Sequence, residues 1–282
     1  MLKIGTCVAF GSMETLEGKL KAMRDSGFDT CQFVSWKMAL WTDENAARIK
    51  ELCEQYGITI SAFWCGWREP VAWDPRNGPL TIGVVPPAFR YERMMNLEAG
   101  ADFAHKLGVR DMITHMGFIP ENPNDPDFVG MCTAVRRVAS YMKNEYDMRL
   151  LFETGQETPM AILRCFETAD CDNLGVNLDT ANLITYGKAN PVDALDTIGK
   201  YVCNVHAKDG TYPTCGFQNG KETPLGQGKV DFPAFIRKLK ELGYEGPLTI
   251  EREISGTAVS VNDEILASRD YLQNILDEVY GG

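Results

Sequence analysis

The sequence lacks the patterns that mark several classes of protein. Its nine cysteines are scattered singly, with no C-x-x-C pair, which is typical of reduced thiols in a cytoplasmic protein. No uncharged run approaches the ~18 residues of a membrane span. The first stretch, MLKIGTCVAF, is too short and too β-like for a signal peptide. We therefore expect a cytoplasmic protein that has no membrane as a partner.

Positive charge is in deficit. The chain has 28 lysines and arginines against 39 aspartates and glutamates, a net charge of −11. Such a surface repels nucleic-acid backbones and anionic lipid, so we expect neither as a partner. With 44% hydrophobic and 24% charged residues, the composition is that of an ordinary soluble globular protein.

Predicted strands and helices alternate along the whole chain. Strands are predicted at 3–9, 28–34, 58–63, 111–114, 150–153, 174–179, 202–206 and 248 to between 251 and 253. Helices are predicted at 13–26, 43–56, 88–107, 127–146, 159–169, 191–200, 231–243 and 262–280. Alternation implies parallel strands joined by right-handed crossovers.

Eight such units in 282 residues match one (β/α)8 barrel of roughly 250 residues. We therefore expect the α/β class, with residues 1–282 forming a single TIM barrel domain. A doubly wound open sheet is the main alternative, but no G-x-G-x-x-G follows the first predicted strand. Residues 66–87, with five prolines, form an extended loop after strand three, too long for a simple connection and typical of a lid or binding loop.

Four polar residues stand where predicted strands five to eight end: Glu153, Asp179, His206 and Glu251. In a (β/α)8 barrel these ends form the active-site face, so the side chains would converge. Three carboxylates and one imidazole suit Mn²⁺ or Mg²⁺ best, with Co²⁺ and Zn²⁺ as further options. The alternative is that each acid caps the next helix and the histidine fills a polar corner.

Several stretches carry a resemblance to a known group. They are LLFETG (150–155), NLDTANL (177–183), VHAKDG (205–210), PLGQGKVDF (224–232) and GYEGPLTIE (243–251). In this order they resemble the xylose isomerase-like TIM barrel superfamily, the sugar phosphate isomerase/epimerase group. The resemblance implies one divalent metal held by Glu153, Asp179, His206 and Glu251. It also implies that Glu153 and Glu251 flank a bound sugar and exchange protons with it.

The chemistry agrees with this expectation. Removing a proton next to a carbonyl gives an enediolate, which a metal can stabilise while two carboxylates act as acid and base. We expect a metal-dependent isomerase or epimerase of a keto-sugar or related polyol. A lyase or dehydratase, similar to inosose dehydratase or to eliminases of oxidised glycosides, is the alternative. A sugar-binding barrel without chemistry is a third reading, against which the presence of all four candidate ligands argues.

The chain departs from two branches of the superfamily. Ketose 3-epimerases have a histidine three residues after the strand-six aspartate, where this chain has Asn182, and an arginine after the strand-seven histidine, where none occurs before Arg237. These differences count against ordinary ketose 3-epimerisation. The endonuclease IV-like branch needs several more histidines than His105, His115 and His206.

Five further residues are predicted to contact the substrate: His115, Lys208, Asn182, Trp64 and Trp67. The tryptophans, like Trp36, would stack on apolar faces of a sugar.

Each of these predictions has a structural alternative: a hydrogen bond for His115, barrel-rim packing for the tryptophans, and an ion pair with Asp209 or Glu253 for Lys208. Glu253 shares the strand parity of Glu251 and is a possible replacement for it as ligand, whereas His105, inside a helix, is expected to be structural. The sequence leaves the oligomeric state open, with a homo-oligomer as one option because relatives of this type are commonly dimers or tetramers.

Overall fold

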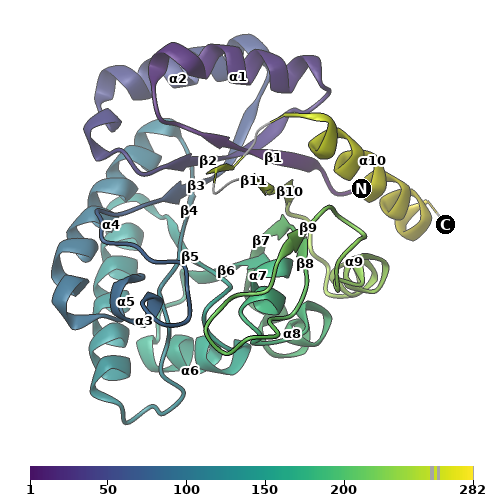
Figure 1. Cartoon of the computed structure of the whole chain (residues 1–282). Helices are drawn as coiled ribbons and strands as arrows, with labels where there is room; N and C mark the ends of the chain where they lie inside the picture. The colour runs from purple at the N-terminus through teal and green to yellow at the C-terminus, as the bar shows by residue number, and fades with distance from the viewer. Residues whose placement is uncertain (255–256, 259–260, 282) are drawn as a thin grey trace.

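In the computed structural model, eight parallel strands close into a barrel surrounded by helices (Figure 1). The structure describes residues 1–254, 257–258 and 261–281. The barrel strands are β1 (Ile4–Ala9), β2 (Thr30–Ser35), β3 (Thr59–Cys65), β4 (Asp111–Thr114), β5 (Arg149–Glu153), β6 (Leu174–Asp179), β7 (Val202–Ala207) and β10 (Leu248–Ile250). Each pairs with its neighbour in the chain, and β1 pairs with β10 to close the ring. The predicted (β/α)8 TIM barrel is confirmed.

Long helices follow the strands and form the outer layer. They are α1 (Met13–Asp25), α2 (Asp43–Tyr56), α4 (Pro87–Leu107), α5 (Pro126–Tyr146), α6 (Pro159–Ala169), α8 (Pro191–Ile198), α9 (Phe232–Glu241) and α10 (Asp263–Tyr280). Their ends follow local sequence signals. The hydroxyl of Thr42 accepts the amide of Asn45 at the start of α2, and Gly57 ends it in the left-handed region at φ 61°.

Several short elements depart from the sequence prediction. The predicted loop 66–87 contains α3 (Gly78–Thr81), and α7 (Thr180–Thr185) follows β6 directly. The helix predicted at 191–200 ends at Ile198, and the 3₁₀ turn η2 (Gly199–Tyr201) follows it; a second 3₁₀ turn, η1 (Met38–Leu40), follows β2. Two small hairpins, β8 (Asp209–Gly210) with β9 (Glu222–Thr223), and β11 (Glu253–Ile254) with β12 (Thr257–Ala258), also lie outside the prediction. Elements this short have no readable periodicity.

The interior of the barrel is largely polar at one end. Strand register brings the inward positions of β6 and β7 side by side, pairing Asn177 with Asn204 and Asp179 with His206. The amide of Gln32 on β2 donates to Asn177 across the barrel at 3.0 Å. A small buried apolar cluster includes Ala62, Ile113 and Leu151, from the neighbouring strands β3, β4 and β5, so close packing supports the strand that carries Glu153.

The extended loop predicted after strand three is confirmed and meets the long segment that follows β7. The side-chain amide of Asn219 donates to the carbonyl of Trp73 at 2.9 Å. The guanidinium of Arg76 lies 4.6 Å from the centre of the Phe217 ring. The two segments therefore cover the same end of the barrel.

Asp209 fixes the segment after β7 at its base. Its carboxylate accepts the backbone amides of Gly210, Gly226, Gly228 and Val230 at 2.8–3.1 Å. A side chain at position 228 would collide with it, because an added Cβ would lie 2.1 Å from the Oδ1 of Asp209. Asp209 is thus occupied by backbone amides.

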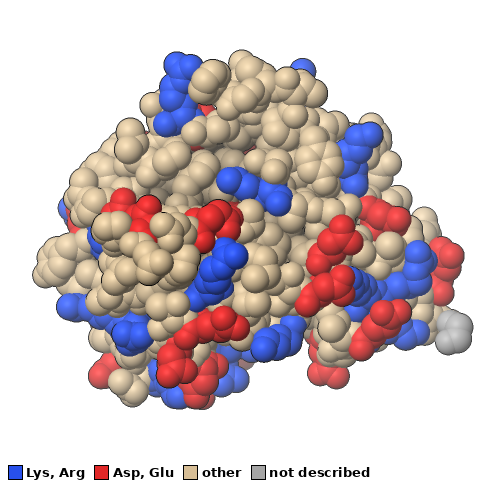
Figure 2. Space-filling view, turned by 90° about the horizontal axis from the view of Figure 1, so that it is seen from below, with Lys and Arg blue, Asp and Glu red and all other residues tan. Residues whose placement is uncertain are grey.

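The surface carries charges of both signs. On the face drawn in Figure 2, acidic and basic side chains are interspersed and neither sign forms one continuous block. No helix in the described part of the chain is long and apolar enough to cross a membrane. The expectation that nucleic acid is not a partner stays a prediction.

A buried ion pair closes the other end of the barrel. Asp111, at the start of β4 and 5% exposed, accepts two hydrogen bonds from Arg149 at 2.7 and 2.8 Å and one from Asn204 at 3.0 Å. Because the three groups come from β4, β5 and β7, they tie together strands that are distant in the chain.

We predict that Asp111→Asn lowers the free energy of unfolding by about 1.5–3 kcal/mol, the usual contribution of hydrogen bonds to charged groups. The matched control is Asp29→Asn, which breaks the exposed Lys3–Asp29 pair and should change it by less than ~1 kcal/mol. Urea unfolding followed by circular dichroism measures both. Equal midpoints for the two variants would contradict the role assigned to Asp111.

Candidate active site

The four residues at the ends of strands five to eight converge. Glu153 ends β5, Asp179 ends β6, His206 lies in β7, and Glu251 follows β10 by one residue. The Nδ1 of His206 lies 2.9 Å from Glu153, 3.3 Å from Glu251 and 3.7 Å from Asp179. One ligand atom from each lies within 4.8 Å of all the others. Strand eight ends at Ile250, earlier than predicted, yet Glu251 keeps the inward direction.

This group fits a divalent cation. Asp179 uses Oδ1 to accept the amide of Asn182 at 2.7 Å and so caps α7. Its Oδ2 is buried and has no hydrogen-bond partner in the described part of the chain. Asp179 therefore does both things that were considered as alternatives: it caps the next helix and it joins the converging group. Carboxylate oxygens and one imidazole nitrogen are the donors that Mg²⁺, Mn²⁺ and Zn²⁺ accept in proteins.

Buried carboxylates this close need positive charge beside them. Burial would raise the pKa of Glu251, but Lys208 and His206 outweigh it and hold the pKa well below its usual value. Burial would likewise raise the pKa of Glu153, but His115 and His206 lower it. Asp179 differs, because its burial raises its pKa to about 7. Basic side chains therefore offset part of the repulsion among the three buried carboxylates.

The two ring nitrogens of His206 have different partners, and Gln32 binds the one that faces away from the carboxylates. Burial would lower its pKa, but Glu251 and Glu153 raise it well above the usual value. Its Nε2 lies 2.5 Å from the Oε1 of Gln32, the same side chain that donates to Asn177. Since an amide oxygen only accepts, Nε2 carries a proton in this pair, and the raised pKa keeps a proton on Nδ1 as well, which a cation bound among the carboxylates would replace.

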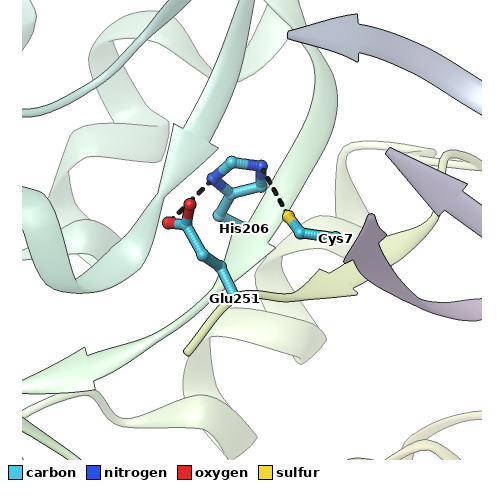
Figure 3. A group of neighbouring side chains, drawn as sticks. All are labelled: Cys7, His206 and Glu251. Atoms are coloured by element: carbon cyan, nitrogen blue, oxygen red, sulfur yellow. Dashed lines mark hydrogen bonds and ion pairs between the residues drawn. The ribbon is translucent and has the colours of Figure 1, made fainter. Parts of the chain in front are cut away.

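Cys7 lies on that rear side as well. Figure 3 shows Glu251 and Cys7 at opposite nitrogens of the His206 ring, with the sulfur 3.9 Å from Nε2. The ligand atoms of these three residues also lie within 4.8 Å of one another. One ion, however, cannot lie beside both nitrogens of the His206 ring. Burial raises the pKa of Cys7 to about 11, so its thiol stays protonated and is a poor ligand. The three-carboxylate group is the better cation site.

Lys208 projects into the same centre. Its ammonium lies 3.1 Å from Glu251, 3.3 Å from Glu253 and 3.8 Å from Glu222. Of the two ion pairs considered as alternatives, the one with Glu253 is present, and Asp209 instead binds backbone amides. The Glu253 side chain is half exposed, whereas Glu251 is buried and lies 3.3 Å from His206, so the geometry favours Glu251 as the ligand.

The other predicted substrate contacts differ in their surroundings. His115 is buried, with Nε2 3.6 Å from the Glu153 carboxylate, and burial lowers its pKa. The indole N–H of Trp64 donates to Glu153. Both line the main cavity, as does Asn182. Trp67 does not: it is 3% exposed and packs against Trp64 and Trp36 behind the cavity wall.

The cavity above these residues has a volume of about 620 Å³. Sequence analysis missed several residues there: Trp73, Tyr186, Gln156 and Glu222, from segments without a readable pattern, and Gln32 beneath them. Gln32 did carry a signal, since a glutamine stands inside the otherwise apolar strand TCQFVS. His105 is exposed and stacks on Tyr146 with ring centres 4.2 Å apart, which fits the structural role expected for it.

Comparisons with known proteins place these features in context. A crystal structure of a xylose isomerase domain protein from Planctomyces limnophilus has 28% identity and a TM-score of 0.89, over 100% of this chain and 99% of that one. A structure of L-ribulose 3-epimerase has 20% identity and a TM-score of 0.77, over 100% and 96%, which shows a common fold.

A curated relative, inosose dehydratase of Lacticaseibacillus casei, is 23% identical over 200 residues, 61% of this chain and 66% of the relative. A family model described as xylose isomerase-like TIM barrel matches residues 20–275. Since that match spans most of the barrel, the chain belongs to the xylose isomerase-like TIM barrel family.

Proposed function

We propose that this protein is a divalent-metal-dependent isomerase or epimerase of a keto-sugar or related polyol. The observation that carries the proposal is the placement of Glu153 and Glu251 within 3.3 Å of one imidazole nitrogen, beside the cavity that both line. Two carboxylates at one small-molecule site are the groups needed to remove a proton from carbon and return it. Membership of the family and the epimerase among similar folds support this choice.

Glu153, Asp179, His206 and Glu251 would hold the cation. When bound, a divalent ion acidifies the carbon next to a sugar carbonyl by drawing electron density from the oxygen. Mn²⁺ and Mg²⁺ fit three carboxylates best, and Co²⁺ or Zn²⁺ fit the imidazole as well.

The chain's own groups then handle the proton. Glu251 is kept ionised by Lys208 and His206, so it is able to accept one. Trp64 and His115 contact the Glu153 carboxylate and fix its direction toward the cavity. Metal-bound carboxylates are poor bases, so each acid needs one oxygen free of the cation. Asn182 and Lys208, both on the cavity wall, would bind sugar hydroxyls.

A lyase or dehydratase is the second candidate. Lys208 favours it, because an ammonium in the cavity 3.1 Å from the Glu251 carboxylate is a donor for a departing hydroxyl group. The relatives named inosose dehydratase point in the same direction. Asn182 occupies the position where ketose 3-epimerases have histidine, which also counts against ordinary 3-epimerisation.

We predict about one equivalent of divalent metal in the purified protein and its loss in Asp179→Asn, since the substitution removes the negative charge of the carboxylate whose Oδ2 is left for the cation. Elemental analysis by inductively coupled plasma mass spectrometry measures both proteins after dialysis. Asp29→Asn, at an exposed site, is the control and should keep its metal. Metal-free wild-type protein that resists reconstitution with Mn²⁺ or Mg²⁺ would refute the cation site.

We predict that Glu153→Gln slows exchange of a sugar C–H with solvent by roughly 10²–10⁴-fold, the usual contribution of a positioned base. A panel of ketohexoses and ketopentoses in heavy water, followed by proton NMR, gives the rate. Glu167→Gln on the exposed side of α6 is the control. A product that differs from the substrate in mass only by the deuterium taken up identifies an isomerase or epimerase, and loss of water identifies a dehydratase. Equal rates in Glu153→Gln and the control would rule out the proposed base.

We predict that Gln32→Leu weakens metal binding about 10–100-fold, the usual effect of removing a group that orients a ligand histidine. The leucine cannot accept the Nε2 proton of His206, so the ring loses its fixed tautomer and direction. Competition with a chromogenic chelator measures the affinity, and thermal unfolding of the chelated protein reports stability separately. Gln55→Leu, on the exposed face of α2, should leave the affinity unchanged; an equally tight Gln32→Leu variant would contradict the role.

A further inference from the structure

The cavity is larger than one sugar ring requires. Its volume is about 620 Å³. A free hexose has about twelve non-hydrogen atoms, and even if each took the ~30 Å³ that a water molecule occupies in the liquid, the sugar would fill little more than half of that space. Room for a further group therefore remains beside any single ring bound at Glu153 and Glu251.

The walls of the cavity change character from its base to its mouth. The base holds Glu153, Glu251, Lys208 and His115, all buried. Trp36 and Trp73 line the outer part and are 38% and 42% exposed. Half-exposed indoles leave large apolar faces in water, and such faces are typical of binding surfaces.

These two indoles are continuous with the inner site. The Trp36 ring centre lies 5.0 Å from that of Trp64, which donates to Glu153. The Trp73 ring centre lies 5.2 Å from His115, and the two outer indoles meet edge-on at 6.2 Å. A ligand that reaches from the carboxylates to the mouth would therefore pass along an unbroken aromatic wall.

Neighbouring segments position both tryptophans. Gly66 makes room for Trp36, because a Cβ at position 66 would lie 2.4 Å from the indole ring. Trp73 is held through its carbonyl, which accepts a hydrogen bond from Asn219 of the segment after β7. A preformed aromatic surface loses little conformational entropy when a flat ring stacks on it.

From these observations we infer that the outer cavity is a subsite for a second ring, so that the substrate is a glycoside in which the ring at the carboxylates carries the carbonyl, such as a disaccharide with one keto-sugar, rather than a free monosaccharide. The inference rests on the proposed function only in deciding which of the two rings reacts. Polar side chains also line the cavity, among them Asn219, Tyr186 and Lys37, and they suit the hydroxyl groups of a second sugar better than a purely aromatic substituent.

The test measures binding, independently of turnover. Isothermal titration with Mn²⁺ present compares cellobiose, maltose, lactose and trehalose with their constituent monosaccharides, and phenyl β-D-glucoside tests an aromatic substituent. We expect at least one disaccharide to bind about tenfold more tightly than its monosaccharides. Trp73→Ala should bring that ratio close to one, and Trp73→Phe, which keeps a ring, should restore most of it. Tyr91→Ala, an exposed aromatic change on α4, is the control.

The outcomes separate this inference from the proposed chemistry. A disaccharide preference that persists in Glu153→Gln, even if no sugar exchanges protons, supports the subsite and refutes only the isomerase. Proton exchange on monosaccharides with no sugar favoured by Trp73 supports the isomerase and overturns the subsite. Preference for the phenyl glucoside over every disaccharide would overturn the assignment of a second sugar ring, as would the absence of any measurable binding.

Discussion

Mutual repulsion among three buried carboxylates is the constraint around which this structure is arranged. Glu153, Asp179 and Glu251 lie within a few ångströms of one imidazole nitrogen, in an interior where water cannot screen their charges. Such a group is stable only with positive charge beside it, which the structure supplies through His206 and Lys208. The same arrangement that would be unfavourable in an ordinary core suits a divalent cation.

The register of the parallel strands brings the carboxylates and the imidazole together. Adjacent parallel strands present paired residues on the same side, so Asp179 and His206 face inward together. Below this pair, Asn177 of β6 and Gln32 of β2 occupy inward positions that an ordinary barrel fills with branched apolar side chains. That polar layer costs hydrophobic burial, but it gives the imidazole a hydrogen-bond partner on its rear nitrogen. The barrel is thus least like a standard core where the chemistry is placed.

Much of this could be read from the sequence, because the fold repeats a simple unit. Alternating strands and helices were enough to predict the barrel, and the polar residues where strands five to eight end were enough to place Glu153, Asp179, His206 and Glu251 at one end. Contacts between distant segments could not be predicted, since no local pattern encodes them. Trp67 illustrates the limit: it lies beside Trp64 in the sequence, yet packs behind the wall that Trp64 forms, while Trp73 from an irregular loop reaches the cavity.

The hydrogen bonds of Asp209 anchor the segment after β7 in a way that does not depend on the length of that segment. Its carboxylate gathers four backbone amides, from Gly210 to Val230, into one stem. Whatever length of chain lies between residues 211 and 225, it leaves and returns through this stem, and each doubling of such a loop adds only about 0.6 kcal/mol of closure entropy. Lys208, directly before the stem, keeps its contact with Glu251 through such changes, whereas its contact with Glu222, 3.8 Å away, belongs to the segment that changes. A segment of different length can therefore replace residues 211–225 while Glu153, Asp179 and Glu251 stay in place. This makes the stem a junction for grafting loops between related barrels.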